Sequence, residues 1–169
     1  MRVLVTYGTK MGGTAGIAEI LGDALSDAGF HVDVRPTADV ADVGAYDAVV
    51  VGGAVYAGRW HRAARRFVKR NTRVLRDRPV WLFSSGPLDG SASYEEILPV
   101  EQVRQLLERV GAAGHATFGG RLRRDAKGFP ASAMAKTHAG DWRDPVHIRA
   151  WAAKLALELR LDRREPLRA

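Results

Sequence analysis

Apolar residues along this chain follow two patterns, short continuous runs and longer segments with a three-to-four-residue spacing. The short runs predict buried strands, and the spaced segments predict helices. The five predicted strands are Arg2–Tyr7, His31–Arg35, Asp47–Gly53, Val80–Ser84 and His115–Phe118. The predicted helices are Thr14–Ala28, Trp60–Leu75, Val100–Val110 and Ile148–Leu159. Because strands and helices alternate throughout, we expect an α/β domain whose parallel sheet carries helices on both faces.

Three segments lie outside this alternation. Ala38–Tyr46 is expected to form a short helix or a loop, and residues 161–169 a basic C-terminal tail beyond a single domain of residues 1–160. Gly119–Pro145 has 27 residues and no clear element. Because a loop between a strand and a helix usually has about 2–6 residues, a loop of this length is generally functional or disordered.

The charge of the chain is concentrated in one segment. The formal net charge is +7, and the segment from Gly58 to Pro79 carries nine arginines and lysines against one acid, Asp77. Such a segment attracts nucleic acid, anionic lipid, an acidic protein or an acidic substrate, although a solvated helix face has the same pattern. There is no cysteine, which excludes thiol catalysis and cysteine-ligated metals. No signal peptide follows Met1, and the longest uncharged apolar stretch, Ala48–Gly58, is too short to span a membrane. We therefore expect a cytoplasmic protein, with peripheral membrane contact as an option.

The first predicted loop, Thr6–Thr14 (TYGTKMGGT), has more hydroxyl and glycine residues than a turn requires. It lies at the carboxyl end of a strand and before a helix N-terminus, where unpaired amides favour an anion. Its glycine spacing does not match the dinucleotide fingerprint. A P-loop requires a lysine directly before the threonine, whereas here Gly13 precedes Thr14. The loop also lacks the acidic residues of a phosphorelay receiver, and Ser84–Pro87 is not a nucleophile elbow.

The same loop resembles the phosphate loop of the flavodoxin family. The residues that carry this pattern are Val5, Tyr7, Thr9, Gly12, Thr14, Ala18 and Leu21; Thr6 departs from it. Further along, the glycine-rich segment Val49–His61 resembles the second flavin loop of the menaquinone-dependent protoporphyrinogen IX dehydrogenases, which share the flavodoxin fold. Phe67–Lys69 and the region of Asp141–Trp142 also have counterparts in that family.

This resemblance implies FMN as the cofactor and a five-stranded parallel sheet in the order 2-1-3-4-5. The residues implied to hold the phosphate are Thr9, Lys10, Met11, Gly12, Gly13 and Thr14. Those implied to cover one face of the flavin ring are Gly53, Ala54, Val55, Tyr56, Ala57, Gly58 and Trp60. Those implied to follow its edge are Ser84, Ser85, Gly86, Pro87 and Leu88.

Several side chains near this implied site have two interpretations. Tyr56 and Trp60 are candidates to stack on the ring, but Trp60 would equally suit the apolar start of its helix. Tyr94 could cover the second face of the ring or be an ordinary loop aromatic. His61 could transfer protons or be a surface histidine. No catalytic residue stands out, and the five histidines have no metal-ligand spacing.

Three functions follow from these observations. The first is an FMN oxidoreductase like the protoporphyrinogen dehydrogenases, which would oxidise a porphyrinogen and pass electrons to a quinone. The long segment Gly119–Pro145 then corresponds to the basic insertion of that family, although it has fewer aromatic residues. The second is a flavodoxin-type electron carrier without its own substrate, which would need an acidic partner. The third, nucleic-acid binding, is disfavoured because Trp60 and Phe67 are the sole aromatic residues of the basic segment and both suit the core.

Overall fold

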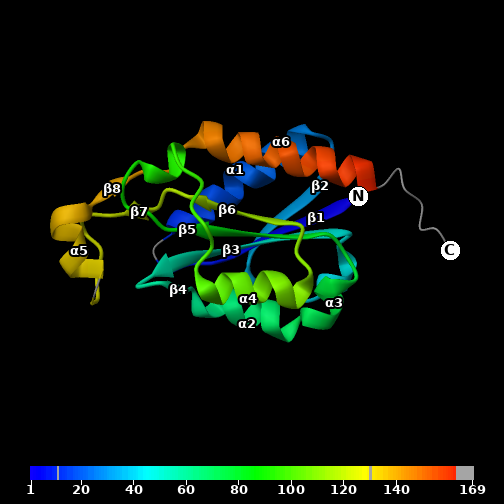
Figure 1. Ribbon diagram of the computed structural model, residues 1–169, viewed down its shortest axis with the longest axis horizontal. Helices are drawn as coiled ribbons and strands as arrows, with labels where there is room; N and C mark the ends of the chain where they lie inside the picture. Colours follow the sequence, from blue (N-terminus) through cyan, green and yellow to red (C-terminus); the bar gives the residue numbers. More distant parts are fainter. Residues whose placement is uncertain (11, 130, 163–169) are drawn as a thin grey trace.

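The computed structural model describes residues 1–10, 12–129 and 131–162 and places a twisted parallel sheet at its centre (Figure 1). The parallel strands are β1 (Arg2–Gly8), β2 (His31–Pro36), β3 (Ala48–Tyr56), β5 (Val80–Ser85) and β6 (Gly114–Phe118). Their spatial order is β2-β1-β3-β5-β6, which confirms the predicted order 2-1-3-4-5. A short sixth strand, β4 (Arg59–Trp60), pairs antiparallel with the end of β3.

Helices cover both faces of the sheet, as predicted. One face carries α1 (Gly13–Asp27) and α6 (Pro145–Asp162), and the other carries α2 (Arg62–Arg70), α3 (Thr72–Arg76) and α4 (Glu101–Val110) (Figure 1). The connections also contain three 3-10 turns, at Thr37–Asp39, Val43–Ala45 and Ser91–Ser93. The central strand β3 sends Val50 into one core and Val49 and Val51 into the other. Because all three valines are fully buried, the uninterrupted apolar run is explained by a strand covered on both sides.

The prediction of one helix over Trp60–Leu75 is wrong at its start and in its middle. The chain first turns back at Ala57 and Gly58, both with positive φ, so that Trp60 pairs with Val55 in a β-hairpin. The helix begins at Arg62, after His61, whose ring nitrogen Nδ1 accepts a hydrogen bond from the Ala63 amide at 3.2 Å. The helix is interrupted at Asn71, whose side-chain amide donates a hydrogen bond to the carbonyl of Phe67 at 2.9 Å. Capping by local side chains therefore overrides the helical spacing of the apolar residues.

The segment Gly119–Pro145, expected to lack regular elements, contains three. These are β7 (Arg121–Leu122), α5 (Ala131–His138) and β8 (Gly140–Asp141), with β7 and β8 paired antiparallel. A small separate core holds them together, formed by Leu122, Ala131 and Ala135 with Leu88 and Met134 packed against it. We call this segment the insertion. Its elements escaped prediction because two-residue strands and an eight-residue, alanine-rich helix are too short to show a periodic pattern.

The last helix also extends further than predicted. Helix α6 continues to Asp162, so Leu161 and Asp162 are helical and not part of a tail, while residues 163–169 lie outside the described residues. Predicted phosphate-loop residue Met11 lies outside them as well. Within the described ranges, no helix combines the length and the apolar character that crossing a membrane would require.

Candidate cofactor pocket

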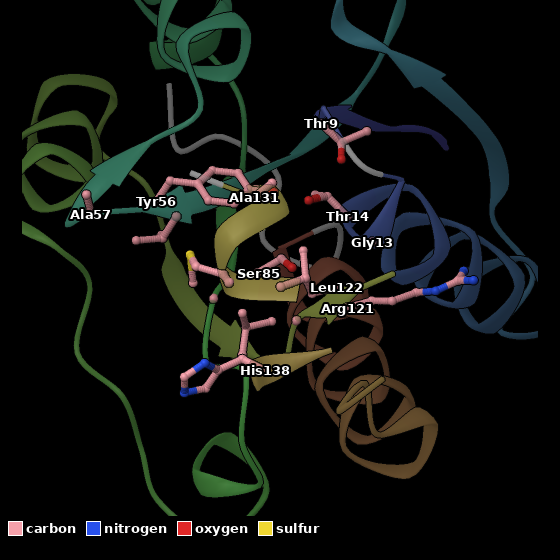
Figure 2. A pocket seen from close by; sticks show the side chains of 16 residues that line it. Thr9, Gly13, Thr14, Tyr56, Ala57, Ser85, Arg121, Leu122, Ala131 and His138 are labelled. Carbon is pink, nitrogen blue, oxygen red and sulfur yellow. The ribbon is translucent and has the colours of Figure 1, made fainter. Parts of the chain in front are cut away.

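A cavity of about 410 Å³ opens at the carboxyl ends of β1, β3 and β5. Figure 2 shows Thr9 and Thr14 on one side of it and Tyr56 and Ala57 on another, with Ala131 of helix α5 drawn between them in this view. Its lining residues from the three predicted loops are Thr9, Gly13, Thr14, Ala54, Val55, Tyr56, Ala57, Ser85, Gly86 and Leu88. The structure therefore brings parts of all three predicted loops to one site, where parallel sheets commonly bind ligands.

The first loop presents a buried hydroxyl to this cavity. Thr9 Oγ1 accepts a hydrogen bond from the Gly12 amide at 3.1 Å, and Gly12 has φ of 80°, a left-handed conformation that favours glycine. Helix α1 then begins at Gly13, so its first amides face the cavity region. The Oγ1 atom of Thr14 is buried and has no hydrogen-bond partner among the described residues. A buried hydroxyl without a partner is costly, so this atom fits a site for an anionic ligand.

The second loop contributes Ala54–Ala57 to the cavity but not Trp60. Tyr56 is half-buried, and burial raises the pKa of its hydroxyl. Trp60 is 2% exposed and lies in the core on the α2 side of the sheet. Its indole packs against Gly53, where a Cβ would lie 2.6 Å from the ring. Trp60 thus fills the space beneath the loop, and its ring does not reach the cavity.

The third loop divides between two sides of the sheet. Ser85, Gly86 and Leu88 line the cavity, whereas Ser84 does not, and its hydroxyl lies 3.0 Å from Nε2 of His115. Pro87 accepts a hydrogen bond from the Gly120 amide at 2.8 Å, which ties this loop to the insertion. The other implied residues also lie outside the lining, namely Lys10, Gly12, Gly53, Gly58 and Pro87. Lys10 and Gly58 are exposed in their loops, and Tyr94 is 88% exposed.

The His115 imidazole beside Ser84 makes the stability of the fold pH-dependent. Burial lowers the pKa of His115 to about 4, whereas in the unfolded chain it is about 6.5. Below pH 6.5 the unfolded chain therefore binds a proton that the folded chain does not, and stability falls until pH 4. We expect a loss of roughly 3 kcal/mol over this range, measured by urea unfolding at a series of pH values.

The control for this effect is a second histidine on the surface. His115→Gln should reduce the pH dependence of stability between pH 6.5 and 4, because the glutamine amide does not titrate. His31→Gln, at an exposed position, should leave the slope unchanged. An unaltered slope in His115→Gln would show that other groups govern the acid sensitivity.

The insertion supplies the far wall of the cavity, which sequence reasoning did not assign to the site. Its lining residues are Gly120, Arg121, Leu122, Ala131, Met134 and His138. The Trp142 amide donates to the Gly120 carbonyl at 3.0 Å and thereby fixes the base of the insertion. Arg121 contributes backbone and stem atoms next to Gly13, while its guanidinium points away from the cavity in Figure 2. The length of the segment and its correspondence to the basic insertion of the dehydrogenase family were the available signals, since none of these residues belongs to a motif.

The chain matches a known domain over most of its length. The profile of the flavodoxin domain matches residues 4–137, which includes all three loops of the cavity and most of the insertion. The chain belongs to the flavodoxin domain family. This membership confirms the predicted family and the predicted cofactor, FMN.

Solved flavodoxins share the fold across nearly the whole chain. A variant of Pseudomonas aeruginosa flavodoxin superposes with a TM-score of 0.63 at 18% identity, covering 95% of this chain and 99% of the flavodoxin. A flavodoxin from Streptococcus pneumonia TIGR4 gives a TM-score of 0.61 at 18% identity, covering 94% of this chain and 99% of that one. At these identities the likeness concerns the fold alone.

A curated relative shows a higher identity over a shorter stretch. Protoporphyrinogen IX dehydrogenase (quinone) of Escherichia coli strain K12 is 30% identical over 86 residues. That stretch covers 50% of this chain and 48% of the relative, so the chain spans about half the length of the curated protein it matches. Two other strains of Escherichia coli give the same match.

The residues around the cavity fit FMN. A terminal phosphate needs hydrogen-bond donors, and the unpaired Thr14 hydroxyl, Thr9 and the first amides of α1 provide them. The flavin ring needs flat or apolar surroundings, which Val55, Tyr56 and Leu88 provide. The phosphate donors and the apolar walls belong to one cavity, as a ring attached to a phosphate requires.

Proposed function

We propose that this flavodoxin-family protein is an FMN-dependent oxidoreductase that oxidises a porphyrinogen-type substrate and passes the electrons to a quinone. The observation that carries the proposal is the second wall of the cavity, built from Leu122, Ala131 and Met134 of the insertion. A large apolar ring system would find an apolar surface there, opposite the loops that fit FMN. The partial match to protoporphyrinogen IX dehydrogenase supports the same assignment.

In this proposal each side of the cavity has its own task. Thr9, Gly13 and Thr14 would bind the phosphate, and Tyr56 would border the ring. Bound FMN supplies the electron chemistry, and the protein supplies its binding, orientation and electrostatic surroundings. Helix α5 and Leu122 would restrict water and align the apolar part of the substrate.

The insertion also provides cations for an acidic substrate. Arg123 is paired with Asp125 at 2.8 Å, whereas no ion pair within the described chain involves Arg121 or Arg124. Both of these side chains are exposed and border a second, open hollow at the β7–β8 hairpin. They would attract the carboxylates of a porphyrinogen without being buried themselves.

The experiment begins with the absorbance spectrum of the purified protein after addition of FMN. A bound-flavin spectrum and quenched flavin fluorescence are expected, and a protein that takes up no FMN would end the proposal. The second step mixes the FMN-loaded protein with protoporphyrinogen and a menaquinone analogue without oxygen and follows porphyrin fluorescence. Porphyrin formation that depends on the quinone is expected.

An electron carrier without its own substrate is the second candidate. It is favoured by the exposed cations that begin at the mouth of the cavity, since a carrier needs a docking surface next to its cofactor. A protein that binds FMN but forms no porphyrin with any quinone would point to this function.

A further inference from the structure

Exposed cations lie along the outer side of α2 and α3. They are Arg62, Arg66, Lys69, Arg70, Arg73 and Arg76, and we call this group the basic face. The opposite side of α2 buries Ala64, Phe67 and Val68 against the sheet. Because both helices are amphipathic, with an apolar side on the sheet and a basic side outside, all of these charges face solvent.

These charges have no counter-charge within the described part of the chain. The ion pairs found there involve other arginines, and none involves a residue of the basic face. Arg78, which the sequence places in the same basic segment, behaves differently. Its guanidinium turns inward and donates to the carbonyls of Val43, Gly44 and Tyr46. Arg78 is a structural residue, whereas the basic face holds the fold together through none of its charges.

The basic face starts at the mouth of the cofactor cavity. Arg59, exposed in the β3–β4 hairpin, pairs across the strands with Tyr56, which lines the cavity. The phosphate loop also begins next to the start of α2, because a Cβ at Gly8 would lie 2.7 Å from the amide nitrogen of Ala64 and 2.8 Å from Nδ1 of His61. A molecule that lies along α2 would therefore have one end beside the cofactor.

The surroundings favour a protein over a flat anionic membrane. Among the described residues, the exposed large apolar side chains are Tyr94, Leu98, Phe129, Val146, Leu157 and Leu161. None belongs to the basic face, which thus lacks side chains that would enter a bilayer. Helix α4 packs beside α2, and its exposed Glu101 and Glu108 are both paired with Arg104, so the charges on that helix largely cancel. The cations without ion pairs are therefore concentrated in a narrow stripe, which a partner protein can match more closely than a plane of lipid headgroups.

Nucleic acid is disfavoured by the same helices. The aromatic residues of this segment, Trp60 and Phe67, are buried in the core and cannot stack on bases. We propose that the basic face docks the acidic surface of a redox partner protein. One end of the docked partner would then lie at the mouth of the FMN cavity. The proposal rests on the second candidate function, the electron carrier, for its purpose, but docking itself can be measured without turnover.

The test measures binding of three probes to the FMN-loaded protein at 50 mM NaCl. The probes are an acidic plant-type [2Fe–2S] ferredoxin, vesicles of phosphatidylcholine with phosphatidylglycerol, and a 20-base-pair DNA duplex. The variant Arg66→Glu/Arg73→Glu reverses two charges on the basic face. Its matched control, Arg35→Glu/Lys154→Glu, makes the same change in net charge at exposed positions on β2 and α6.

The expected result is ferredoxin binding that weakens about tenfold in the basic-face variant, changes less than about twofold in the control, and declines in 300 mM NaCl. Equal losses in both variants, or no ferredoxin binding at 50 mM NaCl, would overturn the proposal. The proposal would also be overturned if the basic-face variant lost binding to vesicles or to DNA while its binding to ferredoxin stayed unchanged. FMN binding is measured for every variant, so a failure of the cofactor proposal is recognised separately from a failure of docking.

Discussion

Replacing Thr14 with valine is expected to weaken FMN binding by about 10- to 100-fold and at the same time to stabilise the FMN-free protein. The Thr14 hydroxyl is buried without a partner, which costs about 1–3 kcal/mol in the free protein. Valine has the same shape and removes this cost. When FMN binds, the hydroxyl is expected to donate to the charged phosphate, and a hydrogen bond to a charged group contributes about 1.5–3 kcal/mol. Fluorescence titration with FMN and urea unfolding of the free protein measure the two opposite effects.

The chain contains a matched control for this substitution. Thr6 is also fully buried with an unpartnered Oγ1 atom, but it lies within β1 and does not line the cavity. Thr6→Val should therefore raise stability without changing FMN affinity. Riboflavin, which has no phosphate, should bind the Thr14→Val variant as it binds the original protein. Equal weakening of FMN and riboflavin would contradict the assignment of Thr14 to the phosphate.

The phosphate loop and the order of the sheet could be predicted because both depend on local patterns. Continuous valines mark a central strand, and the hydroxyl and glycine residues of Thr9–Thr14 lie next to one another in the chain. The first and last residues of helices were harder to predict from the sequence. Trp60 fits a helical spacing, but the two-residue turn before it directs the chain into a hairpin that the apolar pattern cannot reveal.

The insertion shows what sequence patterns could not supply. Its residues Leu122, Ala131 and Met134 are sparse along the chain, and they form a core together with Leu88 from another loop. This small core depends on contacts between distant segments, so neither its existence nor its place in the cavity can be inferred from periodicity. Six of the sixteen residues that line the cavity consequently follow from tertiary packing rather than from a motif.

The base of the insertion gives a second prediction of large effect, for Gly119→Ala. A Cβ at Gly119 would lie 2.0 Å from the carbonyl oxygen of Trp142 and 2.7 Å from its carbon. Because these are backbone atoms, the chain leading from β8 into α6 would have to move. Overpacking of this kind costs about 1–3 kcal/mol, and we expect the upper end, with a fall in Tm of roughly 6–12 °C. The control Gly86→Ala, with its nearest contact at an ordinary 3.7 Å, should change Tm little.

The Gly119→Ala variant also separates the two walls of the cavity. Moving the base of the insertion displaces the wall that carries Leu122 and α5, while the three atoms nearest to the new methyl group all belong to Trp142 and not to the loop around Thr14. FMN and riboflavin should therefore both bind less tightly, and by the same factor. Thr14→Val should instead weaken FMN alone. If Gly119→Ala lowered Tm but left both affinities intact, the insertion would be a structural addition, and the wall that it forms would not contact the flavin ring.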